Sequence, residues 1–379
     1  MYGCCEVSAD RKQATQPRGS AFALKDAPVK QGLAGSSLAL GLLFALLARP
    51  AFGQQAQVPA TQQPLEAKTE LVKLDVSVLN ASGDFVDGLT ENDFRVLDDG
   101  NPRPVAFFAP VSAPAKVVVV LETSPAVYLF KDEHLAAAYS LMKGLAPDDE
   151  VALVTYSNVP RAVVNFTTDK SVLLQALGNT QYMMGSTSLN LYDAVSAVID
   201  GVSRYPGKKA VVLLTTGLDS STPARWTALT QKLRDSDVVI FAVGLAGPLE
   251  AAPDVKEKHG KKVSGAAAFD SVADTGGALT LAKADAALRS LTEITGGSAY
   301  FPASDEDFAP AYREIASSVR HEYVLGVLPD HDGQYHKLTV EVVNPDSAAV
   351  KKKKKKKKKK HEDQEYRVSA REGYVAPGP

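Results

Sequence analysis

Glu122, Thr123 and Ser124 place three oxygen-bearing side chains directly after a long apolar run, residues 117–121. The run consists mostly of valine and has no polar alternation, which is typical of a central strand buried on both faces of a parallel sheet. In open α/β sheets the ligand crevice lies outside the carboxyl ends of the strands. We therefore expect these three side chains to lie at a binding site.

No catalytic constellation can be assembled from the sequence. None of the six histidines lies in a His-Glu-x-x-His pair, there is no Gly-x-Ser-x-Gly elbow, and no glycine-rich loop continues into the Gly-Lys-Ser/Thr of a phosphate site. Glu122 with Asp219 could form a carboxylate pair for glycoside hydrolysis, but no aromatic sugar platform accompanies them. His321 and His336 are expected on the protein surface. We therefore predict that the protein is not an enzyme.

The elements around residues 122–124 alternate between buried strands and helices. Strands predicted from apolar runs are 150–156, 162–166 (an edge strand), 209–216 and 238–243, and helices predicted from helical spacing are 131–145, 169–177, 191–202, 224–235, 288–297 and 308–320. Asp169 is the predicted cap of its helix, and Gly296 and Gly297 are predicted to end theirs. The fold class expected is α/β with a doubly wound, mostly parallel, Rossmann-like sheet.

Turn residues and composition divide the 379-residue chain further. Alternating apolar residues and Gly, Pro, Asn and Asp turns predict small antiparallel β modules at 66–114 and 321–379, on either side of an α/β domain at 115–320. Residues 247–284 are rich in Gly, Ala and Lys and have weak apolar periodicity. We interpret them as a surface insertion.

Residues 32–48 form an uncharged apolar run that follows two lysines and precedes small residues. This pattern predicts a signal peptide over residues 1–53 and a secreted or periplasmic protein, with a disordered lead-in at 54–65. The alternative is an N-terminal membrane anchor, although 17 residues fall short of the roughly 20 that a spanning helix needs. Both cysteines lie in the predicted signal, so no disulfide-linked partner is expected.

Ten consecutive lysines interrupt the C-terminal β module. The net charge is −2 and the lysine run contributes +10, which leaves −12 for the rest of the chain. Such a run stays extended and solvated, and it could contact anionic phospholipid or envelope polyanions, or be a codon expansion that a surface loop tolerates. Nucleic acid is not an expected partner, because no aromatic residues interleave the run. The run is Lys351, Lys352, Lys353, Lys354, Lys355, Lys356, Lys357, Lys358, Lys359 and Lys360.

Several short motifs follow one another in a recognisable order along residues 68–377. They are LDVSV at 74–78, LTENDF at 89–94, LYDA at 191–194, LTEITGG at 291–297, YVLG at 323–326 and AREGY at 370–374. This order resembles the VWFA-related domain proteins of acidobacteria, secreted chains with a small β domain, a von Willebrand factor A domain and a short β tail. The resemblance implies a cell-adhesion or protein-binding role.

The resemblance also implies a metal-ion-dependent adhesion site, which the family builds from an Asp-x-Ser-x-Ser turn, a loop Thr and a third-loop Asp. Here Glu122 stands in the place of the first Asp, Ser124 matches the first Ser, and Ala126 replaces the second. Thr187 matches the loop Thr, and Thr216 stands in the place of the third-loop Asp. Mg²⁺ and Mn²⁺ sites depend on carboxylates, so we predict a degenerate site without a metal cofactor. The alternative is that Mg²⁺ or Mn²⁺ binds to Glu122, Ser124, Thr187, Thr216 and Asp219.

Asp219 could restore a carboxylate to this site if its loop curls back. With or without metal, a protein partner of unknown identity is expected to meet the carboxyl edge of the sheet. The predicted rim consists of Glu122, Thr123, Ser124, Ser186, Thr187, Ser188, Thr216 and Asp219. The alternative is a structural envelope protein that uses the lysine run and leaves this rim idle.

Overall fold

The structure is a computed structural model. The predicted signal peptide, the lead-in, Ser186, Thr187 and all ten consecutive lysines lie outside the described residues. Within the described part of the chain, no helix is long and apolar enough to cross a membrane. The described residues are 71–128, 131–183, 188–245, 255–256, 262–263, 277–343 and 366–379.

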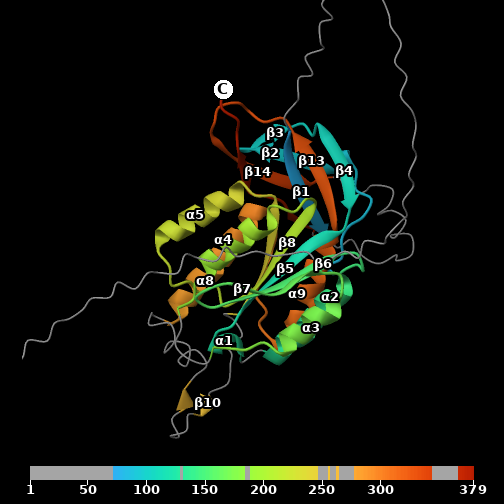
Figure 1. Ribbon diagram of the computed structural model, residues 1–379. Coiled ribbons are helices and arrows are strands. Elements are labelled where there is room, and N and C mark those ends of the chain that lie inside the picture. Colours follow the sequence, from blue (N-terminus) through green and yellow to red (C-terminus); the bar gives the residue numbers. More distant parts are fainter. Residues whose placement is uncertain are drawn as a thin grey trace, which may run out of the picture.

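A six-stranded sheet lies at the centre of the protein (Figure 1). Its strands, in spatial order, are β12 (Ala299–Tyr300), β9 (Val238–Gly244), β8 (Lys208–Thr215), β5 (Ala115–Glu122), β6 (Glu150–Tyr156) and β7 (Arg161–Thr167). All neighbours are parallel except β6 and β7, which form an antiparallel edge. The predicted α/β class with a mostly parallel sheet is confirmed.

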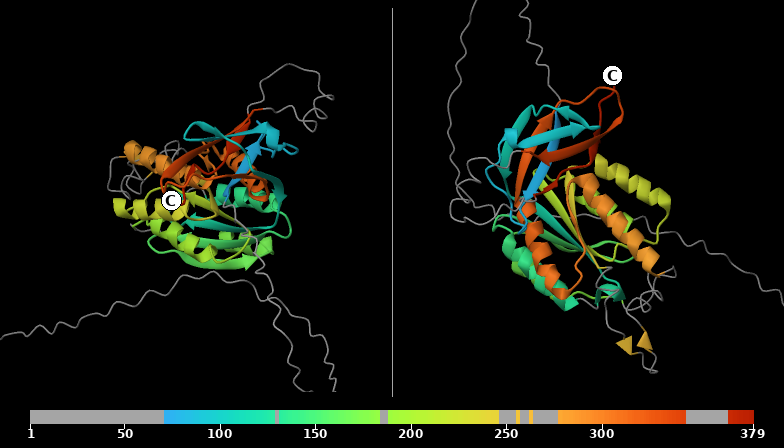
Figure 2. Two further views of the ribbon diagram at one scale, coloured as in Figure 1. Left: turned by 90° about the horizontal axis from the view of Figure 1, so that it is seen from above. Right: turned by 180° about the vertical axis from the view of Figure 1, so that it is seen from behind.

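Helices cover both faces of this sheet (Figures 1 and 2). On one face lie α2 (Lys131–Gly144), α3 (Lys170–Gly178) and α9 (Phe308–Arg320), and on the other lie α4 (Leu191–Val202), α5 (Pro223–Arg234) and α8 (Gly277–Thr295). Alternate side chains of β5 enter the two cores: Val117 and Val119 pack on one side, and Val118 and Val120 on the other. Each such burial stabilises the fold by roughly 1.5–3 kcal/mol, which explains the unbroken valine run.

Helix α8 begins at Gly277, so the predicted start near residue 288 is wrong. Its first turns fall inside residues 247–284, the predicted surface insertion. Buried Leu281, Ala284, Leu288 and Leu291 recur at helical spacing and pack toward the sheet. The alanine- and lysine-rich composition obscured the first two of these positions. Two further strands, β10 (Val255–Lys256) and β11 (Lys262–Val263), pair with each other.

Two antiparallel four-stranded sheets lie at one end of the molecule, beyond the start of β5 (Figure 1). The first is β15 (Arg367–Ser369), β1 (Val72–Leu79), β13 (His321–Val327) and β4 (Phe107–Ser112), in that order. The second is β16 (Gly373–Val375), β14 (Tyr335–Val342), β2 (Phe94–Asp98) and β3 (Asn101–Arg103).

Each of these two sheets combines strands that precede the parallel sheet in the sequence with strands that follow it. Leu74 from β1 and Leu325 from β13, in the first sheet, share one core with Val96 from β2 and Leu338 from β14, in the second. The two sheets therefore fold as one body, which we call the β unit. Short 3₁₀ turns at Glu91–Asp93 and Asp305–Asp307, and the one-turn helix α1 (Pro125–Tyr128), complete the described elements.

The junction between α8 and the sheet requires a glycine. Gly296, with φ +82, ends the helix as predicted, and Gly297 follows it. A Cβ on Gly297 would overlap the carbonyl oxygen of Ile240 in β9. The absent side chain thus lets the chain pass directly against the central sheet.

We predict that Gly297→Ala lowers the free energy of unfolding by about 2 kcal/mol, because a backbone atom cannot move aside cheaply. Gly378→Ala is the matched control, since a Cβ there meets nothing within 4 Å. Urea denaturation of both variants measures the effect. Equal stability of the two variants would contradict the argument.

Candidate functional site

The carboxyl ends of β5, β6 and β8 meet at the edge of the sheet where α1 lies, opposite the β unit (Figure 1). Backbone bonds tie the loops that follow these strands. Thr123 donates its N–H to the carbonyl of Tyr156 (2.8 Å), and Met183 donates to the carbonyl of Thr123 (2.8 Å). Ser220 donates to the carbonyl of Leu189 (2.7 Å). Residues far apart in the sequence thus form one polar site.

The Glu122 carboxylate is the centre of this site. Its Oε2 accepts hydrogen bonds from the hydroxyl of Thr215 (2.8 Å), the backbone N–H and hydroxyl of Thr216 (2.8 and 2.9 Å) and the hydroxyl of Tyr156 (3.2 Å). Its Oε1 accepts from the hydroxyl of Ser124 (2.5 Å). Five donors from three strand ends therefore converge on one side chain.

Glu122 is fully buried, and a buried carboxylate is tolerated only when hydrogen bonds replace its water. Tyr156 takes part twice, because its hydroxyl also lies 2.6 Å from the hydroxyl oxygen of Thr215. Burial and the nearby charge of Glu122 raise the pKa of Tyr156 well above its usual value. The phenol therefore stays neutral and can donate to this network.

The expectation that this polar set forms an exposed rim is corrected for four residues. Glu122, Thr123, Ser124 and Thr216 are buried, and their side chains bond to other groups of the protein. The physical reason is the length of the glutamate side chain. It reaches across to the end of β8, so its hydroxyl neighbours point inward and not toward a partner.

The Asp219 carboxylate accepts hydrogen bonds from its own loop and from the start of α4. One oxygen accepts from the backbone N–H of Tyr192, in the first turn of α4 (2.8 Å), and the other from the N–H of Ser221 (2.6 Å) and its hydroxyl. A carboxylate at a helix N-terminus accepts from a backbone N–H that has no partner within the helix. Its negative charge also interacts favourably with the positive end of the helix dipole. None of these described bonds joins Asp219 to Ser124 or Thr216. Ser188, in the loop before α4, is exposed.

The same edge carries an apolar surface that the sequence analysis missed. Met183 is 48% exposed, Tyr128 and Val159 are also exposed, and Tyr182 is half-buried. The rings of Tyr128 and Tyr182 meet edge to face, with centroids 5.5 Å apart. We call Tyr128, Val159, Tyr182 and Met183 the edge patch. Its members come from helix α1 and two loops, so the pair Tyr182–Met183 is the only part of the patch that is continuous in the sequence.

Within the described residues, one His and Asp group has the spacing of metal ligands, and it lies in the β unit. Ligand atoms of Asp98, Asp330 and His336 lie within 4.8 Å of one another. Arg103 bridges this group, because its Nε lies 3.2 Å from Asp98 and its terminal nitrogen bonds Asp330. The guanidinium already supplies a cation to the two carboxylates. Arg103 thus pairs with two of the three side chains in this group.

His336 is buried within this group, so the expectation of a surface position is wrong for it. Its Nδ1 lies 3.0 Å from both Asp98 and Asp99, and its Nε2 lies 3.2 Å from Asp332. Its ring stacks on Tyr374 at 5.3 Å. The hydrogen bond with Asp332 and the charge of Asp98 raise the pKa of His336 above its usual value.

Comparison with known proteins places the central region in a family. Residues 116–279 match the model of the von Willebrand factor type A domain. An uncharacterised protein of Borreliella burgdorferi is 23% identical over 237 residues, which cover 61% of this chain and 66% of the relative, just under two thirds of its length.

Solved structures of similar fold come from several bacteria. An aerotolerance-related membrane protein of Bacteroides fragilis aligns with a TM-score of 0.40 at 13% identity, over 53% of this chain and 98% of that one. The vWF domain of the type V pili tip protein Mfa5 from Porphyromonas gingivalis aligns with a TM-score of 0.39 at 12% identity, over 55% and 96%. A von Willebrand factor type A protein of Catenulispora acidiphila aligns at 0.38 and 12%, over 73% and 72%.

We predict that Glu122→Ala lowers the free energy of unfolding by about 3 kcal/mol or more, because buried donors lose their acceptor. Glu122→Gln, which keeps the shape and one acceptor oxygen, should lose less. Thermal and urea denaturation measure both changes. A Glu122→Ala protein as stable as the unchanged chain would show that the network adds nothing.

We also predict that titration calorimetry with Mg²⁺ or Mn²⁺ gives no heat beyond dilution. A hard cation would have to displace five donors from the Glu122 carboxylate. Micromolar binding that disappears in Glu122→Ala would overturn this prediction.

The His336 cluster predicts a pH dependence of stability. Because the folded pKa is raised above the ordinary 6.5, the contribution of His336 is fully present below that pH and is lost as pH rises through the folded value. The unfolding free energy of the unchanged chain, relative to His336→Gln, should therefore fall as the pH rises above about 6.5. In an Asp332→Asn background this pH dependence should shrink. A difference in unfolding free energy between the unchanged chain and His336→Gln that does not vary with pH would contradict this prediction.

Proposed function

We propose that this von Willebrand factor A domain protein is a secreted, non-catalytic module that binds a protein partner at the carboxyl edge of its sheet without a metal ion. The observation that carries the proposal is the set of five hydrogen bonds to Glu122. The motif order along the chain supports assignment to the VWFA-related type found in acidobacteria, and the apolar run at 32–48 supports secretion.

Metal-free binding follows from the chemistry of the described site. A divalent ion needs several oxygen ligands that are free to turn toward it, and it gains most from carboxylates. Here the hydroxyls of Ser124 and Thr216 already donate to Glu122. The anion thus takes over the role that a cation would have, which is to hold the loops in place. The hydrogen bonds to Glu122 therefore define the shape of the edge in the protein without a partner.

The edge patch is the part of this surface best suited to contact a partner. Tyr and Met are enriched where protein surfaces bind one another, because they bury a large apolar area. Lys131 also lies over the ring of Tyr128, 4.9 Å from its centroid, which adds a cation beside the patch. An apolar contact flanked by charge does not depend on divalent ions, so binding should persist in a chelator.

Affinity capture from an envelope extract of the producing organism tests this function. We predict that the protein captures the same partner in Mg²⁺ and in EDTA. Met183→Glu should abolish capture, because it puts a charge into the apolar contact. Tyr139→Glu is the matched control, since Tyr139 is 54% exposed on α2 and lies outside the edge patch.

Deleting residues 351–360 separates this proposal from the alternative envelope role. Capture that survives the deletion and fails in Met183→Glu supports the carboxyl edge. Capture that fails only with the deletion, and weakens steeply with salt, would assign the contact to the lysine run instead. Loss of capture in EDTA would refute metal-free binding.

A further inference from the structure

A cleft of about 900 Å³ separates the β unit from the amino-terminal edge of the parallel sheet. Its wall is the outer face of the sheet that contains β1, β13 and β4, and its floor is formed by the first residues of β8 and β9. The cleft lies at the opposite end of the central sheet from Glu122. A space of this size accommodates a drug-sized molecule or a few residues of peptide.

Apolar residues line the wall in strand register. Phe107 lies opposite Gly326, and Ala109 lies opposite Val324, with Val111 two residues further along β4. Phe107 is 48% exposed, whereas the alternate residues of the same sheet form the core of the β unit. Successive rows on such a face are about 7 Å apart, which is also the spacing of alternate side chains in an extended peptide.

Three ion pairs border the floor of the cleft. They are Lys73–Asp75 (2.8 Å), Lys208–Glu322 (2.9 Å) and Lys209–Asp237 (2.7 Å). Because cations and anions are equal in number, the cleft does not favour a ligand of either charge. It offers donors and acceptors side by side, which suits a neutral group that both accepts and donates hydrogen bonds. The backbone amide of a peptide is such a group.

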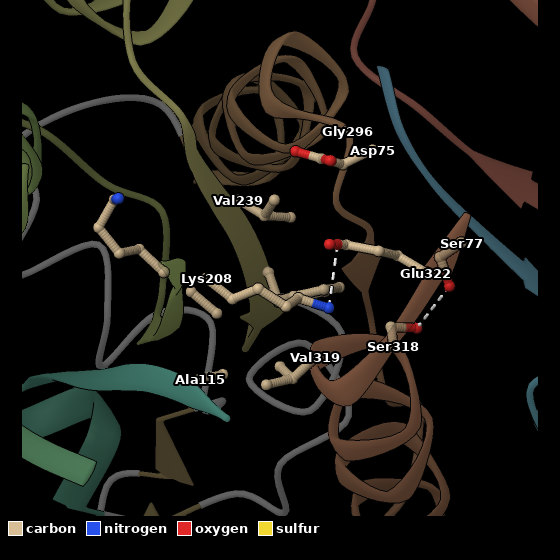
Figure 3. Close-up of a pocket in the computed structure, with 12 residues that line it drawn as sticks. Asp75, Ser77, Ala115, Lys208, Val239, Gly296, Ser318, Val319 and Glu322 are labelled. Carbon is tan, nitrogen blue, oxygen red and sulfur yellow. Dashed lines mark hydrogen bonds and ion pairs between the residues drawn. The ribbon is translucent and has the colours of Figure 1, made fainter. Parts of the chain in front are cut away.

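The pair Lys208–Glu322 lies at the inner end of the cleft (Figure 3). Val239 and Val319 lie around it, and a second chamber of about 30 Å³ adjoins the pair. Burial lowers the pKa of Lys208 and raises that of Glu322, so both charges are poorly solvated. Desolvated polar groups at the end of an apolar cleft are typical of ligand sites.

We propose that this cleft binds a short, extended, apolar segment of a partner protein. Its side chains would pack on Phe107, Val111 and Val324, and its backbone amides would meet the ion-paired floor. Pro110 removes an N–H from β4, which is an edge strand of its sheet, so side-chain contacts and not a continued β-ladder carry the recognition. This site is independent of the carboxyl edge and can succeed or fail without it.

Calorimetric titration of the full chain with a terminally blocked pentapeptide of alternating valine and threonine tests the proposal. We expect saturable binding that becomes at least about tenfold weaker in Phe107→Glu and Val111→Glu, because each puts a charge on the apolar wall. Tyr139→Glu, an exposed aromatic on α2, is the matched control and should bind as the unchanged chain does. Circular dichroism confirms that the variants fold.

Ala109→Trp gives a second, uncharged arm, because it fills the cleft with apolar volume and should block the peptide. Replacing Lys208 and Glu322 together with methionine removes the floor pair without leaving a lone charge, and should weaken the peptide as well. No saturable heat, or equal binding by every variant, would overturn the proposal. Preferential binding of decanoate would also overturn it, because the ligand would then be an anionic amphiphile. A dimer of the chain that Phe107→Glu dissociates would overturn it too, because the cleft would then be occupied by a second copy.

Discussion

A buried anion holds the carboxyl edge of this protein together. The Glu122 carboxylate accepts bonds from groups at the ends of β5, β6 and β8, and the hydroxyl of Tyr156 at the end of β6 reinforces this junction by contacting both Glu122 and Thr215. Because an unpaired carboxylate in this position would be costly, the loops are constrained to the positions that satisfy it. The shape of the edge, and hence of any surface built on it, follows from that constraint.

The replacement of aspartate by glutamate changes what this edge can do. One additional methylene carries the carboxylate to the backbone N–H of Thr216, where the side chain can bond the neighbouring strand end. The hydroxyls of Ser124 and Thr216 then complete an internal network and do not remain available as a cation shell. The hydrogen bonds of Glu122 instead hold the ends of β5, β6 and β8 together.

The opposite end of the central sheet is organised differently. There the β unit, built from both ends of the chain, leaves an apolar cleft with paired charges along its floor. The carboxyl edge is closed by polar bonds, whereas the amino-terminal edge remains open beside the β unit. The parallel sheet thus separates a hydrogen-bonded edge from a cavity.

The sequence by itself determined the elements whose burial is periodic. The valine run of β5, the cap at Asp169, which accepts from the N–H of Ser171 (3.0 Å), and the helix end at Gly296 all follow from residues a few positions apart. The convergence of residues 122–124 and 215–219 also followed, because parallel strands share one edge.

Only the tertiary structure decided which polar groups meet. Asp98 and His336 are 238 positions apart, and nothing in their local sequence predicts their contact. The burial of Thr216, the edge patch and the cleft likewise depend on how separate elements pack. The spacing of apolar residues predicts which face of an element is buried. Which group pairs with a buried charge depends on how the whole chain packs.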